Sequence, residues 1–146
     1  MSKVKLGEVV SYSKLKGTFD DISIDSYITT DNLLQNKLGI TKAIGIPPRG
    51  NSFPLYQKND ILISNIRPYL KKTWFANQSG ICSSDVLVLK TGNNYSPRFV
   101  YYTLFQDAFF DHMTKGSKGT KMPRGDKNQI LDFEIPSFSL QTQQRI

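Results

Sequence analysis

Several residue types that support common protein chemistries are scarce in this sequence. The 146 residues include one cysteine, Cys82, and one histidine, His112. A lone cysteine cannot form an internal disulfide, and one cysteine with one histidine cannot supply the three or four ligands of a zinc site. No apolar run reaches the 18 residues of a membrane-spanning helix, and the first ten residues hold no signal-peptide core. We therefore expect a cytoplasmic chain without disulfides, zinc or membrane segments.

The residues that are present are typical of a folded protein with a basic surface. The chain is 38% hydrophobic and 21% charged, and its length suits one domain with a real core. Lysine and arginine exceed the acids by seven, and residues 49–127 hold the excess, with twelve basic and five acidic residues. Cations interleaved with glycine, proline and aromatic residues indicate a polyanionic partner, most often a nucleic acid.

The apolar pattern predicts one helix and several short strands. Residues 96–116 give the clearest helix, because Ser96 can cap it, Pro97 suits its first position and Gly116 suits its end. Strands are expected within residues 22–29, 60–66, 72–77 and 85–90, and a long loop over residues 39–53. Asp31 is expected to cap a short helix. We predict an α/β or α+β fold with a twisted, mostly antiparallel or mixed sheet, one long packed helix and long loops.

A run of evenly spaced cations stands out near the C-terminal end of the basic segment. Glycine and proline interrupt this stretch, so it is expected to be a loop. In an extended chain, cations three residues apart spread over about 30–40 Å, enough to follow several phosphates. The candidate nucleic-acid contacts here are Lys115, Lys118, Thr120, Lys121, Arg124 and Lys127. Charge alone fits a solvated, flexible loop equally well.

Two other sites carry candidate contacts, and we expect them to lie near Lys118, Lys121 and Arg124 on one DNA-binding surface. Between two predicted strands, Arg67 can contact guanine through two hydrogen bonds and Tyr69 can stack or bond a phosphate, with Lys71 and Lys72 adding charge. The alternative is an arginine and a tyrosine packed on a sheet edge. Arg49 follows two prolines and can enter a groove from a stiff loop tip, or simply be solvated.

Three enzyme motifs are incomplete in this sequence: those of a P-loop, an amino-methyltransferase and a metal nuclease. Residues 45–52 have the spacing of a P-loop, but Asn51 replaces the required lysine, and Pro47 and Pro48 lack two of the N–H groups that cradle phosphate. Those prolines also lack the preceding Asn or Asp of an amino-methyltransferase, and the glycine-rich loop of a cofactor fold is missing. Glu134 lacks the nearby lysine of a metal nuclease. Binding is therefore favoured over catalysis.

Five segments, in the same order and over nearly the whole chain, resemble the target-recognition domain of type I restriction-modification specificity subunits. They are YITTDNLL (27–34), DILISNIRPYLKKTWFA (60–76), CSSDVLVLK (82–90), GSKGTKMPRGDK (116–127) and FEIPSFSLQTQQRI (133–146). The glycine-rich basic stretch is the most characteristic of them. One departure is Ser139, which stands where the family commonly has a second proline.

The resemblance implies a division of labour. Such a domain reads one half of a bipartite double-stranded DNA target and is not an enzyme. It binds no cofactor, because S-adenosylmethionine, ATP and magnesium belong to its partner subunits. Its expected partners are DNA, modification subunits, a restriction subunit, and a second recognition domain or half-subunit. Residues 1–138 would form the domain, and residues 139–146 would begin a spacer helix that the chain end cuts short.

Three other hypotheses compete with this one. A sequence-nonspecific nucleic-acid-binding module would also be basic and aromatic, and would bind unrelated sequences equally well. A small nuclease or methyltransferase would show turnover by the purified chain. A protein-interaction domain is the weakest alternative, because it leaves the basic segment unexplained.

Overall fold

A four-stranded antiparallel sheet forms the centre of the protein. The computed structural model describes residues 2–19, 24–47 and 50–145. In spatial order, the central sheet contains β2 (Val10–Tyr12), β9 (Val86–Thr91), β6 (Ile61–Ser64) and β7 (Thr73–Phe75). In the register of the two middle strands, Ile61 lies opposite Leu89 and Ile63 opposite Leu87.

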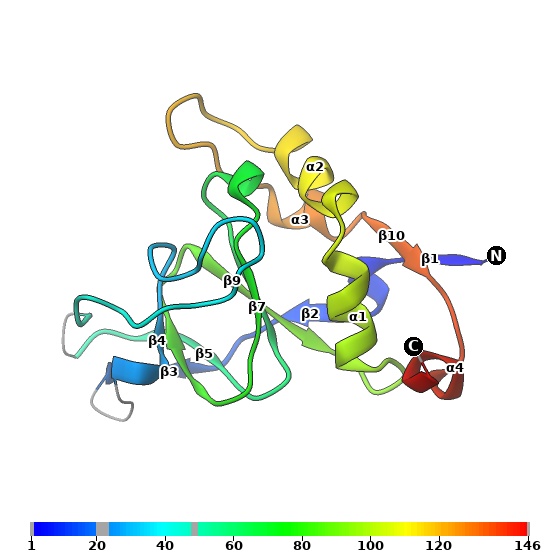
Figure 1. Cartoon of the computed structure of the whole chain (residues 1–146), viewed down its shortest axis with the longest axis horizontal. Helices are drawn as coiled ribbons and strands as arrows, with labels where there is room; N and C mark the ends of the chain where they lie inside the picture. The colour runs from blue at the N-terminus through cyan, green and yellow to red at the C-terminus, as the bar shows by residue number, and fades with distance from the viewer. Residues whose placement is uncertain (1, 20–23, 48–49, 146) are drawn as a thin grey trace.

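A second sheet of four short strands lies on one side of the first (Figure 1). Its spatial order is β3 (Lys16–Gly17), β5 (Phe53–Tyr56), β8 (Gly80–Cys82) and β4 (Tyr27–Ile28). The β4–β8 pair is parallel and the other pairs are antiparallel, so this sheet is mixed. A third, two-stranded sheet joins β1 (Lys3–Lys5) to β10 (Glu134–Pro136).

The central sheet is buried on both faces. Ile61, Ile63 and Leu89 belong to the core cluster that the helices cover. Leu62 and Val88 point the other way, into a cluster with Tyr56 and Cys82 of the second sheet. Strands covered on both sides need no polar face, which explains why β6 and β9 are continuous apolar runs rather than alternating ones.

Three helices pack on the face of the central sheet opposite the second sheet (Figure 1). They are α1 (Pro97–Leu104), α2 (Asp107–Lys115) and α3 (Lys127–Ile130). The short α4 (Leu140–Arg145) lies beside the start of α1, where Gln143 Oε1 accepts a hydrogen bond from the Ser96 amide at 2.7 Å. Three 3-10 turns complete the described elements: η1 (Leu6–Glu8), η3 (Ile24–Ser26) and η4 (Pro68–Leu70). Within the described ranges, no helix combines the length and the apolar character needed to cross a bilayer.

The single long helix expected over residues 96–116 is wrong in one respect, because it is two helices. Its start is as predicted, since the Ser96 hydroxyl accepts a hydrogen bond from the Phe99 amide at 3.3 Å. Gly116 caps the end. Between them, Gln106 has an extended backbone (φ −87°, ψ 152°), which separates α1 from α2. The change of direction lets apolar side chains of both helices enter one core, including Leu104 and Phe110.

The fold class is confirmed, as α+β with one antiparallel and one mixed sheet. Short elements differ from expectation. The strand expected at residues 22–29 is β4 preceded by η3, with residues 22 and 23 outside the described ranges. The helix expected after Asp31 is instead a turn, which Asn32 fastens because its side-chain Nδ2 donates to the Tyr27 and Thr41 carbonyls at 3.0 Å each. Strands β3, β5 and β8 were not predicted.

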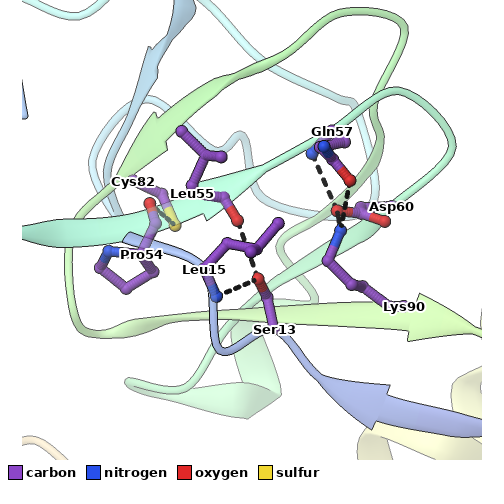
Figure 2. A network of polar contacts seen from close by, with 8 residues as sticks. All are labelled: Ser13, Leu15, Pro54, Leu55, Gln57, Asp60, Cys82 and Lys90. Carbon is purple, nitrogen blue, oxygen red and sulfur yellow. Dashed lines mark hydrogen bonds and ion pairs between the residues drawn. The ribbon is translucent and has the colours of Figure 1, made fainter. Parts of the chain in front are cut away.

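A polar network fastens the turn before β6 to the sheets (Figure 2). The Lys90 ammonium group donates to Asp60 Oδ2 at 2.8 Å and to Gln57 Oε1 at 3.0 Å. The Asp60 side chain is only 8% exposed and also accepts from the Gln57 amide at 2.8 Å. Beside this network, the Ser13 hydroxyl donates to the Leu55 carbonyl at 2.9 Å. Burial raises the pKa of the nearby Cys82 thiol to about 12, so Cys82 is an inert core residue.

We predict that Lys90→Met destabilises the protein by roughly 1–3 kcal/mol, because it leaves the Asp60 carboxylate buried without its cation. Lys58→Met is the matched control, since Lys58 is exposed in the same turn, and should change stability by less than about 0.5 kcal/mol. Urea unfolding measures both variants. Equal stability of the two would show that the ion pair contributes nothing.

Candidate nucleic-acid interface

Two segments that are distant in sequence form one surface. We name residues 65–72, between β6 and β7, the η4 loop, and residues 116–126, between α2 and α3, the basic loop. The Arg67 amide donates to the Pro123 carbonyl at 2.7 Å, and the Gly125 amide donates to the Asn65 carbonyl at 3.0 Å. Ile66 and Arg124 form an antiparallel bridge between these bonds. The two loops therefore lie side by side at one end of the central sheet (Figure 1).

The basic loop is closed on itself rather than extended. The Lys118 amide donates to the Arg124 carbonyl at 3.0 Å, and the Arg124 amide donates back to the Lys118 carbonyl at 2.9 Å. Gly119 has a φ of +101°, a conformation that glycine adopts without strain, and so begins the turn. The expectation of cations spread along an extended chain is wrong. Instead, Thr120 and Lys121 are exposed at the tip of a small closed loop.

The η4 loop presents Arg67 and Tyr69 on a strained backbone. Arg67 and Lys71 flank η4 and both have left-handed backbones, with φ of 50° and 56°. This conformation costs non-glycine residues about 1–2 kcal/mol each, so surrounding contacts must hold it. Arg67 is exposed, and its Nε donates to the Lys121 carbonyl at 3.4 Å. Tyr69 is 50% exposed.

The contacts that hold the η4 loop come from residues 36 and 37 and from the start of α2. The amides of Asn36 and Lys37 donate to the carbonyls of Leu70 and Lys71 at 2.9 and 2.7 Å. The ammonium groups of Lys37 and Lys71 lie 2.8 and 2.9 Å from Asp107 Oδ1. Hydrogen bonds and charge from Lys37 and Lys71 lower the pKa of Asp107 to about 2. Asp107 therefore links two cationic segments at the N-terminus of α2.

Some of the predicted cations bond to other groups of the protein, and others are exposed to solvent. Lys71 is bound to Asp107, and the Lys72 ammonium group donates to the Thr30 carbonyl at 2.6 Å, so both stabilise the loop. Lys115, Lys118 and Lys121 are exposed. DNA contact by all of these residues stays a prediction. Arg49 lies outside the described residues.

Lys127 and His112 fasten the basic loop at its ends. The Lys127 ammonium group lies 4.7 Å from the centre of the Tyr12 ring, and the Tyr12 hydroxyl donates to the Lys127 carbonyl at 2.9 Å. His112 is partly buried, and its Nε2 lies 2.7 Å from the Gln129 carbonyl oxygen. These contacts join α2, α3 and β2 beneath the loop.

Sequence reasoning missed an acidic residue in this surface. Asp85, in the turn before β9, forms an ion pair with Arg124. The pair stands at the edge of an open cleft of about 300 Å³ that Asn65, Lys16 and Lys127 also line. An isolated Asp in a Ser-Ser-Asp sequence carries no signal of its position. In the described part of the chain, no group of three or more His, Cys, Asp or Glu side chains is arranged to hold a metal ion.

The chain has relatives of known family. The model of the type I restriction modification DNA specificity domain matches residues 1–146. The chain belongs to this family. Membership confirms the predicted resemblance and the prediction that the chain is a specificity component rather than an enzyme.

Three specificity subunits resemble this chain at low sequence identity. It is 24% identical over 91 residues to the type I restriction enzyme EcoDI specificity subunit of Escherichia coli, covering 62% of this chain and 20% of that one. Its fold matches the HsdS subunit of Thermoanaerobacter tengcongensis with a TM-score of 0.75 and 21% identity, over 99% of this chain and 39% of that one. The match to the type I restriction-modification S subunit from M. genitalium has a TM-score of 0.64 and 16% identity, over 99% of this chain and 36% of that one. The chain thus spans well under half of these relatives.

We expect the Asp107 carboxyl to titrate near pH 2, which NMR of a side-chain-labelled sample can measure. Because this pKa lies below the unfolded value of about 4, the cluster contributes stability above pH 4 and loses it as the pH falls through 2. Lys71→Met should raise the pH midpoint of the Asp107 titration, because it removes one of the two cations that lower this pKa. A wild-type midpoint near 4 would contradict the ion-pair geometry.

Proposed function

We propose that this chain recognises a specific sequence in double-stranded DNA and reads one half of a bipartite target for a type I restriction-modification complex. The observation that carries the proposal is the backbone-bonded junction of the η4 loop and the basic loop. It gathers exposed cations and an exposed tyrosine from two distant segments onto one rigid support. Lysines there would neutralise phosphates and fix the register, while a few side chains read base edges.

The proposed partners follow from the family. Besides DNA, we propose modification subunits, a restriction subunit, and a second recognition domain or half-subunit. S-adenosylmethionine, ATP and magnesium would be bound by those partner subunits, and the complex would work in the cytoplasm. The support is family membership together with the limited share of its relatives that the chain spans.

Replacing Lys118 and Lys121 together by alanine should weaken DNA binding and make it less dependent on salt. If each lysine neutralises one phosphate, the slope of log affinity against log salt should fall in magnitude by about 2. Fluorescence anisotropy with a labelled duplex at several salt concentrations measures it. The control is the double variant Lys3→Ala with Lys58→Ala, which removes the same charge. Lys58 lies at the opposite end of β6 from the η4 loop. Equal slopes in both double variants would refute the proposed surface.

Selection from a pool of randomised duplexes distinguishes specific recognition from a nonspecific module. The specificity domain should enrich one short motif, since discrimination of about 1–3 kcal/mol for each contacted base pair accumulates over a half-site. Sequencing of the bound duplexes measures this. A pool that stays random after several rounds would favour the nonspecific module.

A further inference from the structure

Three chain segments meet at the Arg124–Asp85 ion pair. The Asn65 amide donates to the Asp85 carbonyl at 2.8 Å, and the Gly125 amide donates to the Asn65 carbonyl at 3.0 Å. Gly125 permits this approach, because a Cβ there would lie 2.6 Å from Asn65 Oδ1. The turn before β9, the η4 loop and the basic loop are thus joined by backbone contacts around the pair.

These backbone contacts hold the loop without help from the two side chains. The reciprocal hydrogen bonds between Lys118 and Arg124 already close the basic loop, and the bridge to Ile66 already docks it. The Arg124 side chain is 51% exposed and that of Asp85 is 33% exposed. An ion pair so accessible to water contributes about 0–1 kcal/mol. Stability therefore gives little reason for placing the pair here.

The two side chains offer a pattern of donors and acceptors that matches one kind of base pair. The ion pair uses Nη1 of Arg124, and a guanidinium carries five N–H donors in a planar fork. In the major groove, guanine presents the O6 and N7 acceptors and its cytosine presents an N4 amino donor. An arginine fork beside a carboxylate complements both partners at once.

The cleft beside the ion pair has polar walls, which suits the polar edge of a base pair. Asn65 Oδ1 is buried and has no hydrogen-bond partner among the described residues. Asn65 lines the same cleft as Arg124 and Asp85, and Ser84 and Lys127 extend its polar lining. Lys16 also lines this cleft and adds a cation suited to a flanking phosphate.

We propose that Arg124 and Asp85 act together as a specificity-determining pair that reads one G·C base pair in the major groove. Arg124 donates to guanine O6 and N7, and Asp85 orients the guanidinium and accepts from cytosine N4. This inference rests on the proposed function, since it names the base pair that the DNA-binding surface would read.

The test repeats the randomised-duplex selection with variants of the full chain. The wild type should enrich a motif with at least one invariant G·C position. Arg124→Lys, which keeps the charge but loses the fork, and Asp85→Ala, which loses the acceptor, should relax the same position. The loss of discrimination there should be about tenfold or more. Lys121→Ala is the control and should weaken binding to every sequence alike.

The outcomes separate this inference from the proposed function. If the wild type enriches no motif, the proposed function fails. If it enriches a motif that Arg124→Lys and Asp85→Ala leave unchanged, or if both variants lose affinity equally for all sequences, only the inference fails. Circular dichroism melting of each variant identifies any that do not fold, and the two single variants test the pair independently.

Discussion

The short antiparallel junction between the η4 loop and the basic loop is the constraint on which the rest of the surface depends. Its bonds run from the Arg67 amide to the Pro123 carbonyl and from the Gly125 amide to the Asn65 carbonyl. Backbone groups make these bonds, so the junction itself does not use the side chains of Arg67, Lys121 and Arg124. The junction fixes a cationic loop, which would otherwise be solvated, against the η4 loop at the end of the central sheet. This arrangement reduces the conformational entropy that binding to DNA must remove.

The strained η4 loop shows how the fold supports this surface. Left-handed backbones at Arg67 and Lys71 persist because the opposing segment donates two amide hydrogen bonds and because Asp107 holds Lys37 and Lys71 together. Asp107 occupies the start of α2, a position that the break between α1 and α2 creates. The helix break therefore has a structural role beyond packing, since a continuous helix would place this carboxylate elsewhere.

Much of the fold could be predicted from local pattern. Strands β6 and β9 are strong apolar runs, and Ser96, Pro97 and Gly116 mark the limits of the helical segment. The remainder depends on long-range contacts that no local pattern records. Strands β3, β5 and β8 contain two to four residues each and are defined by their neighbours in the mixed sheet. The α1–α2 break depends on the shape of the core.

The composition of the candidate site was predictable, but the bonds that build it were not. Glycines and evenly spaced cations identified the basic loop, and cations between two predicted strands identified the η4 loop. The two were expected to lie near one another, but the backbone junction that joins them was not predicted. Asp85 and Asp107 were missed because an acid in a basic surface is recognised only through its partner. Lys72 lies in the η4 loop, but no local pattern indicated that its ammonium group donates to the Thr30 carbonyl.

Hydrogen exchange measured by mass spectrometry, with and without a duplex that the chain binds, tests the central claim most directly. If the two loops form one DNA-binding surface, peptides from residues 65–72 and 116–126 should be protected together when DNA is added, while peptides around Lys58 should not change. Protection of only one of the two loops, or of neither, would contradict the account.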